Sequence, residues 1–265
     1  ELLGVKTVTG ESHQRAKIAS AICRVAGKQF PIIPGLENPL LVEPRQTSAP
    51  QAIRLENWSH ANQFPQVNAI HFLAERILAN PGEVTLLSIG PLTNIALLFS
   101  VYPKTISALK QLVMMCGVFS EAAKKQHLVE WNAQLDPHAT AMVYNAGVNK
   151  HKSIGLDVTL QVGLSKQQVL KCFKHPILQL ILDFASVWFE DNDLLTFHDP
   201  LAAVSIFDRD ICQFDSGRVM VNYDAVAEQT GETIFIENKQ EKRHMIASGV
   251  NADRFFDAYF EVFNT

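Results

Sequence analysis

Two polar side chains capable of chemistry stand side by side in the stretch Leu195-Thr-Phe-His198-Asp199-Pro200. An aspartate is a ligand for hard metal cations, and a histidine can donate a proton near neutral pH. Asp199 is also a good N-cap and Pro200 a good first helical residue, so the same residues predict an ordinary helix start at Asp199. The two interpretations are compatible, because a carboxylate at a helix N-terminus can still face a cation.

A second polar pair lies in Glu130-Trp131-Asn132, where a carboxylate and an amide are two residues apart. In an extended segment both side chains point to the same side. Such a pair suits sugar hydroxyl groups, since a carboxylate accepts hydrogen bonds and an amide both donates and accepts them. The alternative is a surface loop with a packed tryptophan, and the sequence leaves both interpretations open.

Two further segments have simpler interpretations. Gly90 joins a predicted strand to a helix, where a glycine lets backbone groups face a ligand, although a tight turn explains it more simply. Asp136-Pro137-His138 predicts a helix start with a solvent-facing histidine. No GxxxxGK[ST], GxGxxG or GxSxG motif occurs. The sequence therefore indicates neither a phosphate-binding loop nor the triad of an α/β-hydrolase.

Strands and helices alternate along the chain, and this alternation predicts one α/β domain with a mostly parallel central sheet flanked by helices. The loops after its strands should converge on one cleft, because ligands of such sheets bind outside the carboxyl ends of the strands. Gly90, Gly117, Asp157 and the loop before His198 are expected there. The predicted strands are residues 2–8, 30–33, 84–89, 112–115 and 153–157, with 218–222 and 232–236 as an antiparallel addition; the predicted helices are residues 11–26, 65–80, 92–102, 136–144, 165–173, 176–190, 199–207 and 252–263.

Composition argues against several classes of partner. The net charge of -4 is not that of a nucleic-acid-binding surface. No apolar run approaches the roughly 18–20 residues that a membrane span requires. The four cysteines, Cys23, Cys116, Cys172 and Cys212, are scattered without metal-ligand spacing, as in the reduced thiols of a cytosolic protein. We therefore expect a cytoplasmic protein with neither a nucleic-acid nor a membrane partner.

Seven segments, in order along the chain, together resemble the inosine/uridine-preferring nucleoside hydrolase family. Each segment is weak evidence alone, but seven in the family's order are specific. The resemblance implies one Rossmann-like nucleoside hydrolase domain over residues 1–265. The segments are Leu2–Gly10, Glu83–Leu98, Met115-Cys-Gly117, Glu130–Pro137, Gly155-Leu-Asp-Val-Thr159, His198-Asp-Pro-Leu201 and Ala252–Phe256.

The resemblance implies a calcium-dependent enzyme that hydrolyses the N-glycosidic bond of ribonucleosides to free base and ribose. It makes Asp199 and the main-chain carbonyl of Ile89 calcium ligands, and it places His198 where it protonates the leaving base. Glu130 and Asn132 would hold the ribose hydroxyls. The physical chemistry agrees, since carboxylates stabilise an oxocarbenium-like state, a poor leaving group needs a proton, and a bound cation activates water. A homo-oligomer, dimer or tetramer, is also implied.

The chain departs from the family pattern in several places. The family's aspartate-rich motif, which supplies further metal ligands, belongs ahead of Glu1, so we expect this chain to lack its first strand and metal-binding loop. Glu11 and Lys124 stand where the family often has asparagine, and Leu160 stands where it often has histidine. These differences leave the nucleobase preference open. They also leave an alternative, a non-catalytic nucleoside- or sugar-binding scaffold on the same fold.

Overall fold

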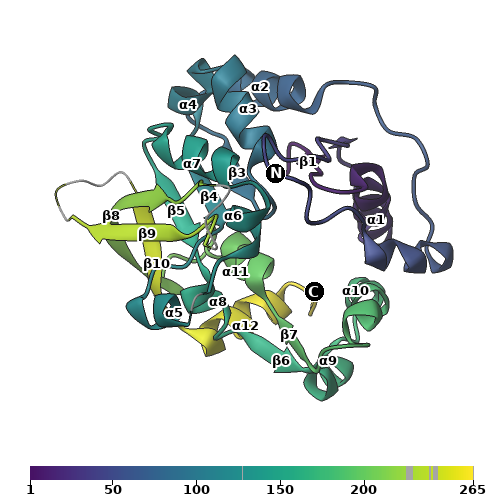
Figure 1. Ribbon diagram of the computed structural model, residues 1–265. Coiled ribbons are helices and arrows are strands. Elements are labelled where there is room, and N and C mark those ends of the chain that lie inside the picture. Colours follow the sequence, from purple (N-terminus) through teal and green to yellow (C-terminus); the bar gives the residue numbers. More distant parts are fainter. Residues whose placement is uncertain (127, 225–228, 239, 241–243, 265) are drawn as a thin grey trace.

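The computed structural model describes residues 1–265 apart from residues 127, 225–228, 239, 241–243 and 265 (Figure 1). Its centre is a six-stranded mixed sheet. In spatial order the strands are β3 (Thr85–Ser88), β4 (Gln111–Met115), β5 (His151–Ile154), β10 (His244–Val250), β8 (Cys212–Val221) and β9 (Thr233–Glu237). The first four run parallel, and β8 and β9 continue the sheet antiparallel. The predicted mostly parallel sheet with late antiparallel strands is confirmed.

Strand β4 shows why the sheet needs helices on both faces. Successive side chains of a strand point to opposite faces. Leu112 and Met114 pack in one apolar cluster with side chains of α2 (Ala69–Ala79), α3 (Thr93–Val101) and α7 (Pro137–Asn145). Val113 and Met115 pack in another with α9 (Lys166–Cys172), α10 (Pro176–Trp188), α11 (His198–Val204) and α12 (Ala252–Glu261). A strand covered on both faces is apolar where it is buried, as this one is from Leu112 to Met115.

The N-terminal strand–helix–strand unit stands apart from the central sheet. Strands β1 (Val5–Lys6) and β2 (Ile32–Ile33) pair in parallel across helix α1 (Ser12–Val25), as the sequence predicts. They form a separate two-stranded sheet, however, and not part of the six-stranded one. Helix α1 packs on α10 and on the 3-10 helix η1 (Pro50–Asn57). Figure 1 shows this unit beside the central sheet.

Several elements differ from the predictions. Strand β10 was not predicted, although it lies in the middle of the sheet. The predicted strand 153–157 ends earlier, at Ile154, and Asp157 belongs to helix α8 (Leu156–Thr159). Two short helices fall where the sequence predicts none, and two short strands pair antiparallel with each other. They are α5 (Glu121–Lys125), α6 (Trp131–Leu135), β6 (Gly163–Ser165) and β7 (Leu194–Thr196), and the short helix α4 (Lys104–Ala108) precedes β4.

The C-terminal helix α12 docks on the body of the molecule through a face of aromatic side chains. Phe255 is completely buried, and the ring of Phe197 lies 5.4 Å from that of Phe256 and 5.1 Å from that of Tyr259, centroid to centroid. Phe197 is the residue before His198. Burial of these rings therefore holds the start of α11 in place.

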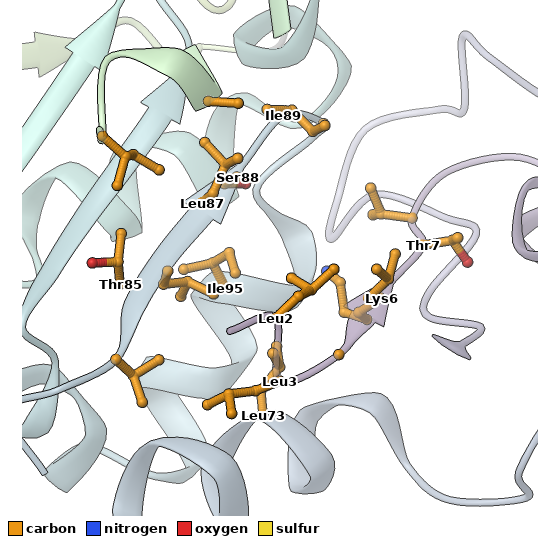
Figure 2. A pocket seen from close by; sticks show the side chains of 18 of the residues that line it. Leu2, Leu3, Lys6, Thr7, Leu73, Thr85, Leu87, Ser88, Ile89 and Ile95 are labelled. Carbon is orange, nitrogen blue, oxygen red and sulfur yellow. The ribbon is translucent and has the colours of Figure 1, made fainter. Parts of the chain in front are cut away.

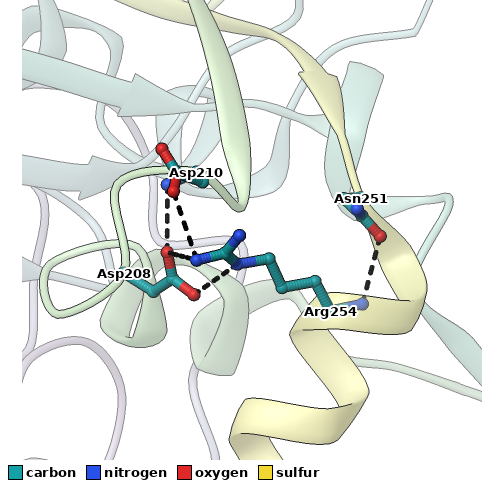
Figure 3. Close-up of polar contacts among 4 residues, drawn as sticks. All are labelled: Asp208, Asp210, Asn251 and Arg254. Atoms are coloured by element: carbon teal, nitrogen blue, oxygen red, sulfur yellow. Dashed lines mark hydrogen bonds and ion pairs between the residues drawn. The ribbon is translucent and has the colours of Figure 1, made fainter.

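Polar contacts fix the first turn of α12 (Figure 3). Asn251 is its N-cap, and its Oδ1 accepts a hydrogen bond from the Arg254 backbone N–H at 3.1 Å. The Arg254 guanidinium donates to both carboxylate oxygens of Asp208, at 2.6 and 2.9 Å, and lies 3.2 Å from Asp210. A two-pronged contact of this kind sets the direction of the helix as well as its position.

Among the described residues, we find no helix with both the length and the apolar character needed to cross a membrane.

Candidate active site

His198 is the first residue of α11 and is held from outside that helix. Its Nδ1 lies 2.8 Å from the Thr159 hydroxyl oxygen at the end of α8. Nε2 has no hydrogen-bond partner among the described residues. Burial lowers the pKa of His198 below its ordinary value, because the imidazolium loses part of its hydration. A histidine held by one ring nitrogen with the other free is arranged for proton transfer.

Asp199 lies in the first turn of α11, and the prediction that it is the N-cap was wrong. The N-cap is Phe197, whose carbonyl accepts the first helical hydrogen bond, from the Leu201 N–H. No described residue donates a hydrogen bond to the Asp199 carboxylate. Burial, and then the negative charge of Glu130, raise its pKa to about 7. A carboxylate in this state gains from a proton or a cation.

Glu130 is buried, with 3% of its surface exposed, and caps helix α6. Its Oε1 accepts from the Asn132 N–H at 2.8 Å, and its Oε2 accepts from the N–H groups of Ala133 at 3.0 Å and Gly117 at 3.4 Å. Burial raises the pKa of Glu130 to about 7, and these hydrogen bonds oppose the rise. The buried position rules out the surface-loop interpretation.

Asn132 lies inside α6 and not in an extended segment, so the reasoning that paired it with Glu130 was wrong. Its side-chain amide donates to the Met115 carbonyl at 3.0 Å, at the end of β4. The two side chains still meet at that strand end, since Glu130 accepts from Gly117 two residues later. Asn132 is helical because Glu130 is an N-cap, so the helix begins immediately after Glu130.

Helix α8 positions the loop after β4 as well as the histidine. The Asp157 carboxylate accepts from the backbone N–H groups of Phe119 at 2.7 Å and Ser120 at 2.9 Å. The Leu156 N–H donates to the Gly117 carbonyl at 2.9 Å. Thr159, which the sequence did not identify as a site residue, holds His198. The segment Gly155-Leu-Asp-Val-Thr159 was the signal that could have found it.

Ile89 follows β3, and 45% of its surface is exposed. It lines, together with Asn132, a groove of about 1610 Å³ that extends along β3 (Figure 2). The next residue, Gly90, allows β1 and β3 to approach at their carboxyl ends, because a Cβ there would lie 2.9 Å from Cγ1 of Val8. Residues from the ends of β3, β4 and β5 therefore line one edge of the sheet, as the topology predicted.

The described residues do not by themselves make a calcium site. Calcium takes six to eight oxygen ligands, several of them from carboxylates. The predicted donors, Asp199 and the Ile89 carbonyl, supply too few. Within the described part of the chain no three His, Cys, Asp or Glu side chains are grouped to hold a metal ion.

The three positions that depart from the family pattern, Glu11, Lys124 and Leu160, lie in different environments. Glu11 adopts the left-handed conformation, with φ 56°, and its carboxylate accepts from the Ala49 N–H at 2.7 Å, so it braces the start of α1. Leu160 is exposed at the end of α8. Lys124 lies in α5, and its side chain is outside what the structure describes.

The helix start at Asp136 is confirmed, but its environment is not the predicted one. Asp136 is fully buried and accepts from the Thr93 hydroxyl at 2.7 Å, the Leu40 N–H at 2.9 Å and the Ala139 N–H at 3.0 Å. His138 is half-buried against the ring of Tyr223 and does not face solvent freely. This cluster joins α3 and α7 and does not belong to the candidate site.

Known proteins resemble this chain in fold or in sequence. A purine-preferring ribonucleoside hydrolase from Gardnerella vaginalis superimposes with a TM-score of 0.82 at 20% sequence identity, over 98% of this chain and 89% of that one. Uridine nucleosidase 1 of Arabidopsis thaliana is 28% identical over 241 residues, which are 83% of this chain and 70% of that protein. An uncharacterized protein of Schizosaccharomyces pombe is 33% identical over 187 residues, and the match covers 64% of this chain and 57% of that relative.

The family assignment rests on how much of the chain matches the family's sequence pattern. The sequence pattern of the inosine-uridine preferring nucleoside hydrolases covers residues 1–257. The six-stranded mixed sheet flanked by helices agrees with the solved structures. The chain belongs to the inosine-uridine preferring nucleoside hydrolase family.

Proposed function

We propose that this protein hydrolyses the N-glycosidic bond of a ribonucleoside to free base and ribose. Family membership supports the class of reaction. One observation carries the assignment to residues: a histidine with a free ring nitrogen stands beside Asp199, which feels the charge of Glu130, at the carboxyl edge of the sheet. Glycosidic cleavage uses a proton donor for the leaving group and negative charge beside the sugar ring, and these residues would supply both.

His198 is the proposed general acid for the leaving base. Its hydrogen bond to Thr159 fixes the ring and leaves Nε2 available. The lowered pKa makes the imidazolium a stronger acid but a less populated one, so the rate should fall as pH rises through that pKa. A base that leaves with a proton is a better leaving group.

The carboxylates of Asp199 and Glu130 are proposed to act on the ribose side of the breaking bond. The ribose ring gains positive charge as the bond breaks, and negative groups in a poorly hydrated site stabilise that charge. Glu130 and Asn132 are proposed to contact the ribose hydroxyls through carboxylate lone pairs and the amide oxygen. Their hydrogen bonds to the backbone hold both side chains in one orientation, which reduces the entropy lost on binding. Water attacks the ribose carbon and supplies its new hydroxyl.

Asp199 and the Ile89 carbonyl alone do not provide the ligands of the calcium ion that the family resemblance implies.

The test is ribose release from uridine and from inosine, measured as reducing sugar. Replacing Asp199→Ala or His198→Ala should each lower the turnover by at least about a hundredfold, the usual scale for one acid–base or electrostatic group. His71→Ala on the exposed face of α2 is the matched control and should keep full turnover. Unchanged turnover in both site variants would overturn the assignment.

The second candidate is a non-catalytic nucleoside- or sugar-binding scaffold. The small number of metal donors among the described residues favours it. Isothermal titration with uridine separates the two, since a scaffold binds without releasing ribose. The predicted homo-oligomer and cytoplasmic location stay predictions.

A further inference from the structure

Four polar side chains form a buried row that ends at the candidate site. Ser153 is on β5, Tyr144 is on α7, Cys116 directly follows β4, and Glu130 is the N-cap of α6. Their exposed fractions are 0%, 2%, 0% and 3%, so the polar row is closed to solvent. Cys116 and Tyr144 pack in the same apolar cluster. Polar groups buried this deeply need one another as hydrogen-bond partners.

Each member of the polar row contacts the next. The Tyr144 hydroxyl oxygen lies 2.8 Å from Oγ of Ser153. The Cys116 thiol is a hydrogen-bond partner of the Tyr144 hydroxyl on one side and of the Glu130 carboxylate on the other. The next residue, Gly117, donates its backbone N–H to Oε2 of the same carboxylate at 3.4 Å. The thiol and the adjoining backbone therefore approach Glu130 together from the end of β4.

The chemistry of the four groups gives the polar row one direction. An ionised carboxylate can only accept, so the Cys116 thiol donates to Glu130. A thiol has one proton, so its sulfur accepts from the Tyr144 hydroxyl, whose oxygen then accepts from Ser153. The pKa shifts agree. Burial and then the Glu130 charge raise the pKa of Cys116, whereas the Tyr144 hydroxyl lowers it. Burial and then Cys116 raise the pKa of Tyr144, whereas Ser153 lowers it.

Two buried histidines hold the Tyr144 ring in place. The ring of His151 stacks on it, with 5.0 Å between the centroids and 21° between the planes. His244 meets it edge-on at 5.3 Å, and Nε2 of His244 lies 2.8 Å from the Tyr144 carbonyl oxygen. Burial, and then His244, lower the pKa of His151 to about 3, so the His151 ring carries no charge near neutral pH. Packing therefore fixes the hydroxyl that donates to Cys116.

We propose that Cys116 is a positioning residue of the candidate site: a one-way relay of hydrogen bonds passes through Tyr144 and Cys116 and ends on the Glu130 carboxylate, whose direction it fixes. The backbone donors of Glu130 come from α6 and from Gly117, and the thiol adds a side-chain donor. Hydrogen bonds in a row polarise one another, and those to an ionised acceptor are the stronger kind. The role of Cys116 rests on the proposed function, in which Glu130 contacts the ribose.

The relay can be tested without turnover in the intact protein. The S–H stretching band of a Raman spectrum moves to lower wavenumber when the thiol donates a hydrogen bond. The band that disappears in Cys116→Ala should lie below that of the exposed Cys172. It should move back up in Glu130→Gln, which weakens the acceptor, and in Tyr144→Phe, which removes the donor behind the thiol. Cys212→Ser, in another buried cluster, is the matched control and should leave the band in place.

Ribose release from uridine shows whether the relay positions Glu130. Cys116→Ala should lower kcat by about tenfold with little change in KM, because a misdirected carboxylate loses most where positive charge develops in the transition state. Cys116→Ser keeps a proton donor at this position and should restore most of kcat. Cys212→Ser should keep full turnover. Urea denaturation measures the stability of each variant separately, so a general loss of folding is distinguished from a loss of orientation.

The outcomes separate this inference from the proposed function. An equal loss of kcat in Cys116→Ala and Cys116→Ser, or full turnover in both, overturns the positioning role. A Cys116 band at the position of an exposed thiol, or one that Glu130→Gln does not move, overturns the relay even if the protein releases ribose. A shifted band in a protein that releases no ribose supports the relay and contradicts the proposed function.

Discussion

At the scale of single residues, the site is defined by which polar groups have partners and which do not. His198 is held by Thr159 through one ring nitrogen, and Glu130 is held by three backbone N–H groups. The Asp199 carboxylate has no hydrogen-bond donor among the described residues. This combination fixes two groups and leaves the third ready for a proton, a cation or a developing positive charge.

Thr159 is a positioning residue, and its replacement tests that role. Thr159→Val keeps the shape of the side chain but removes the hydroxyl that contacts His198 Nδ1. We expect the kcat for ribose release to fall by about tenfold with little change in KM, because the imidazole loses its fixed orientation and the sugar contacts remain. Thr159→Ser should restore most of kcat. An equal loss in both variants would show that the hydroxyl has no such role.

Glu130 should make the protein less stable as pH rises. Its pKa in the folded protein is about 7, against 4.5 for an ordinary glutamate, so the folded state holds a proton that the unfolded state has lost between these values. Stability therefore falls from about pH 4.5 to about pH 7. Glu130→Gln should reduce the loss of unfolding free energy between pH 5 and pH 8 by about 2 kcal/mol, measured by urea denaturation. The exposed control Glu56→Gln should leave that loss unchanged, and an unchanged loss in Glu130→Gln would contradict the buried charge.

At the scale of elements, α12 determines where α11 begins. The aromatic face of α12 surrounds Phe197, and Phe197 provides the first helical carbonyl of α11. The contact of Arg254 with Asp208 ties the same helix to the segment after α11. The position of His198 and Asp199 is thus a consequence of packing some sixty residues further along the chain.

Removing a ring from this contact should be costly. Phe255→Ala leaves a cavity in a completely buried cluster and should lower the free energy of unfolding by about 3–5 kcal/mol. Phe207→Ala is the control, because that ring is 87% exposed, and its effect should stay within about 0.5 kcal/mol. Denaturant unfolding measures both. Similar losses for the two variants would show that α12 does not dock as described.

At the scale of the whole molecule, the parallel arrangement of β3, β4, β5 and β10 brings their carboxyl ends to one edge. The candidate residues gather there. Ile89 and Asn132 also line the groove that extends along β3, so the groove and the candidate site share residues.

The donor set of the described residues predicts weak calcium binding. Residues 1–265 should bind calcium with a Kd above about 1 mM by isothermal titration, because one carboxylate and one carbonyl leave most of the coordination sphere to water. Asp199→Asn should not change this result measurably. Micromolar affinity in residues 1–265, lost in Asp199→Asn, would show that the present residues already form the site.

The sequence by itself determined the α/β class, most helices and the strands β3 and β4. These depend on local properties, namely apolar periodicity, N-caps such as Asp136 and turn residues such as Gly90, which act within a few positions of the chain. The sequence motifs also located Glu130, His198 and Asp199. Their proposed roles came from the family resemblance and stay predictions.

Only the tertiary structure decided how those residues are held. The parallel placement of β10 beside β5 joins segments about ninety residues apart, and no local pattern encodes such a pairing. The Glu130–Gly117 and Thr159–His198 contacts likewise depend on which elements pack together. Helix α11 begins at His198, one residue before the predicted start, because Phe197 packs against α12. Local sequence patterns predicted a helix start at the His198-Asp199 segment, and long-range packing decided where its side chains lie.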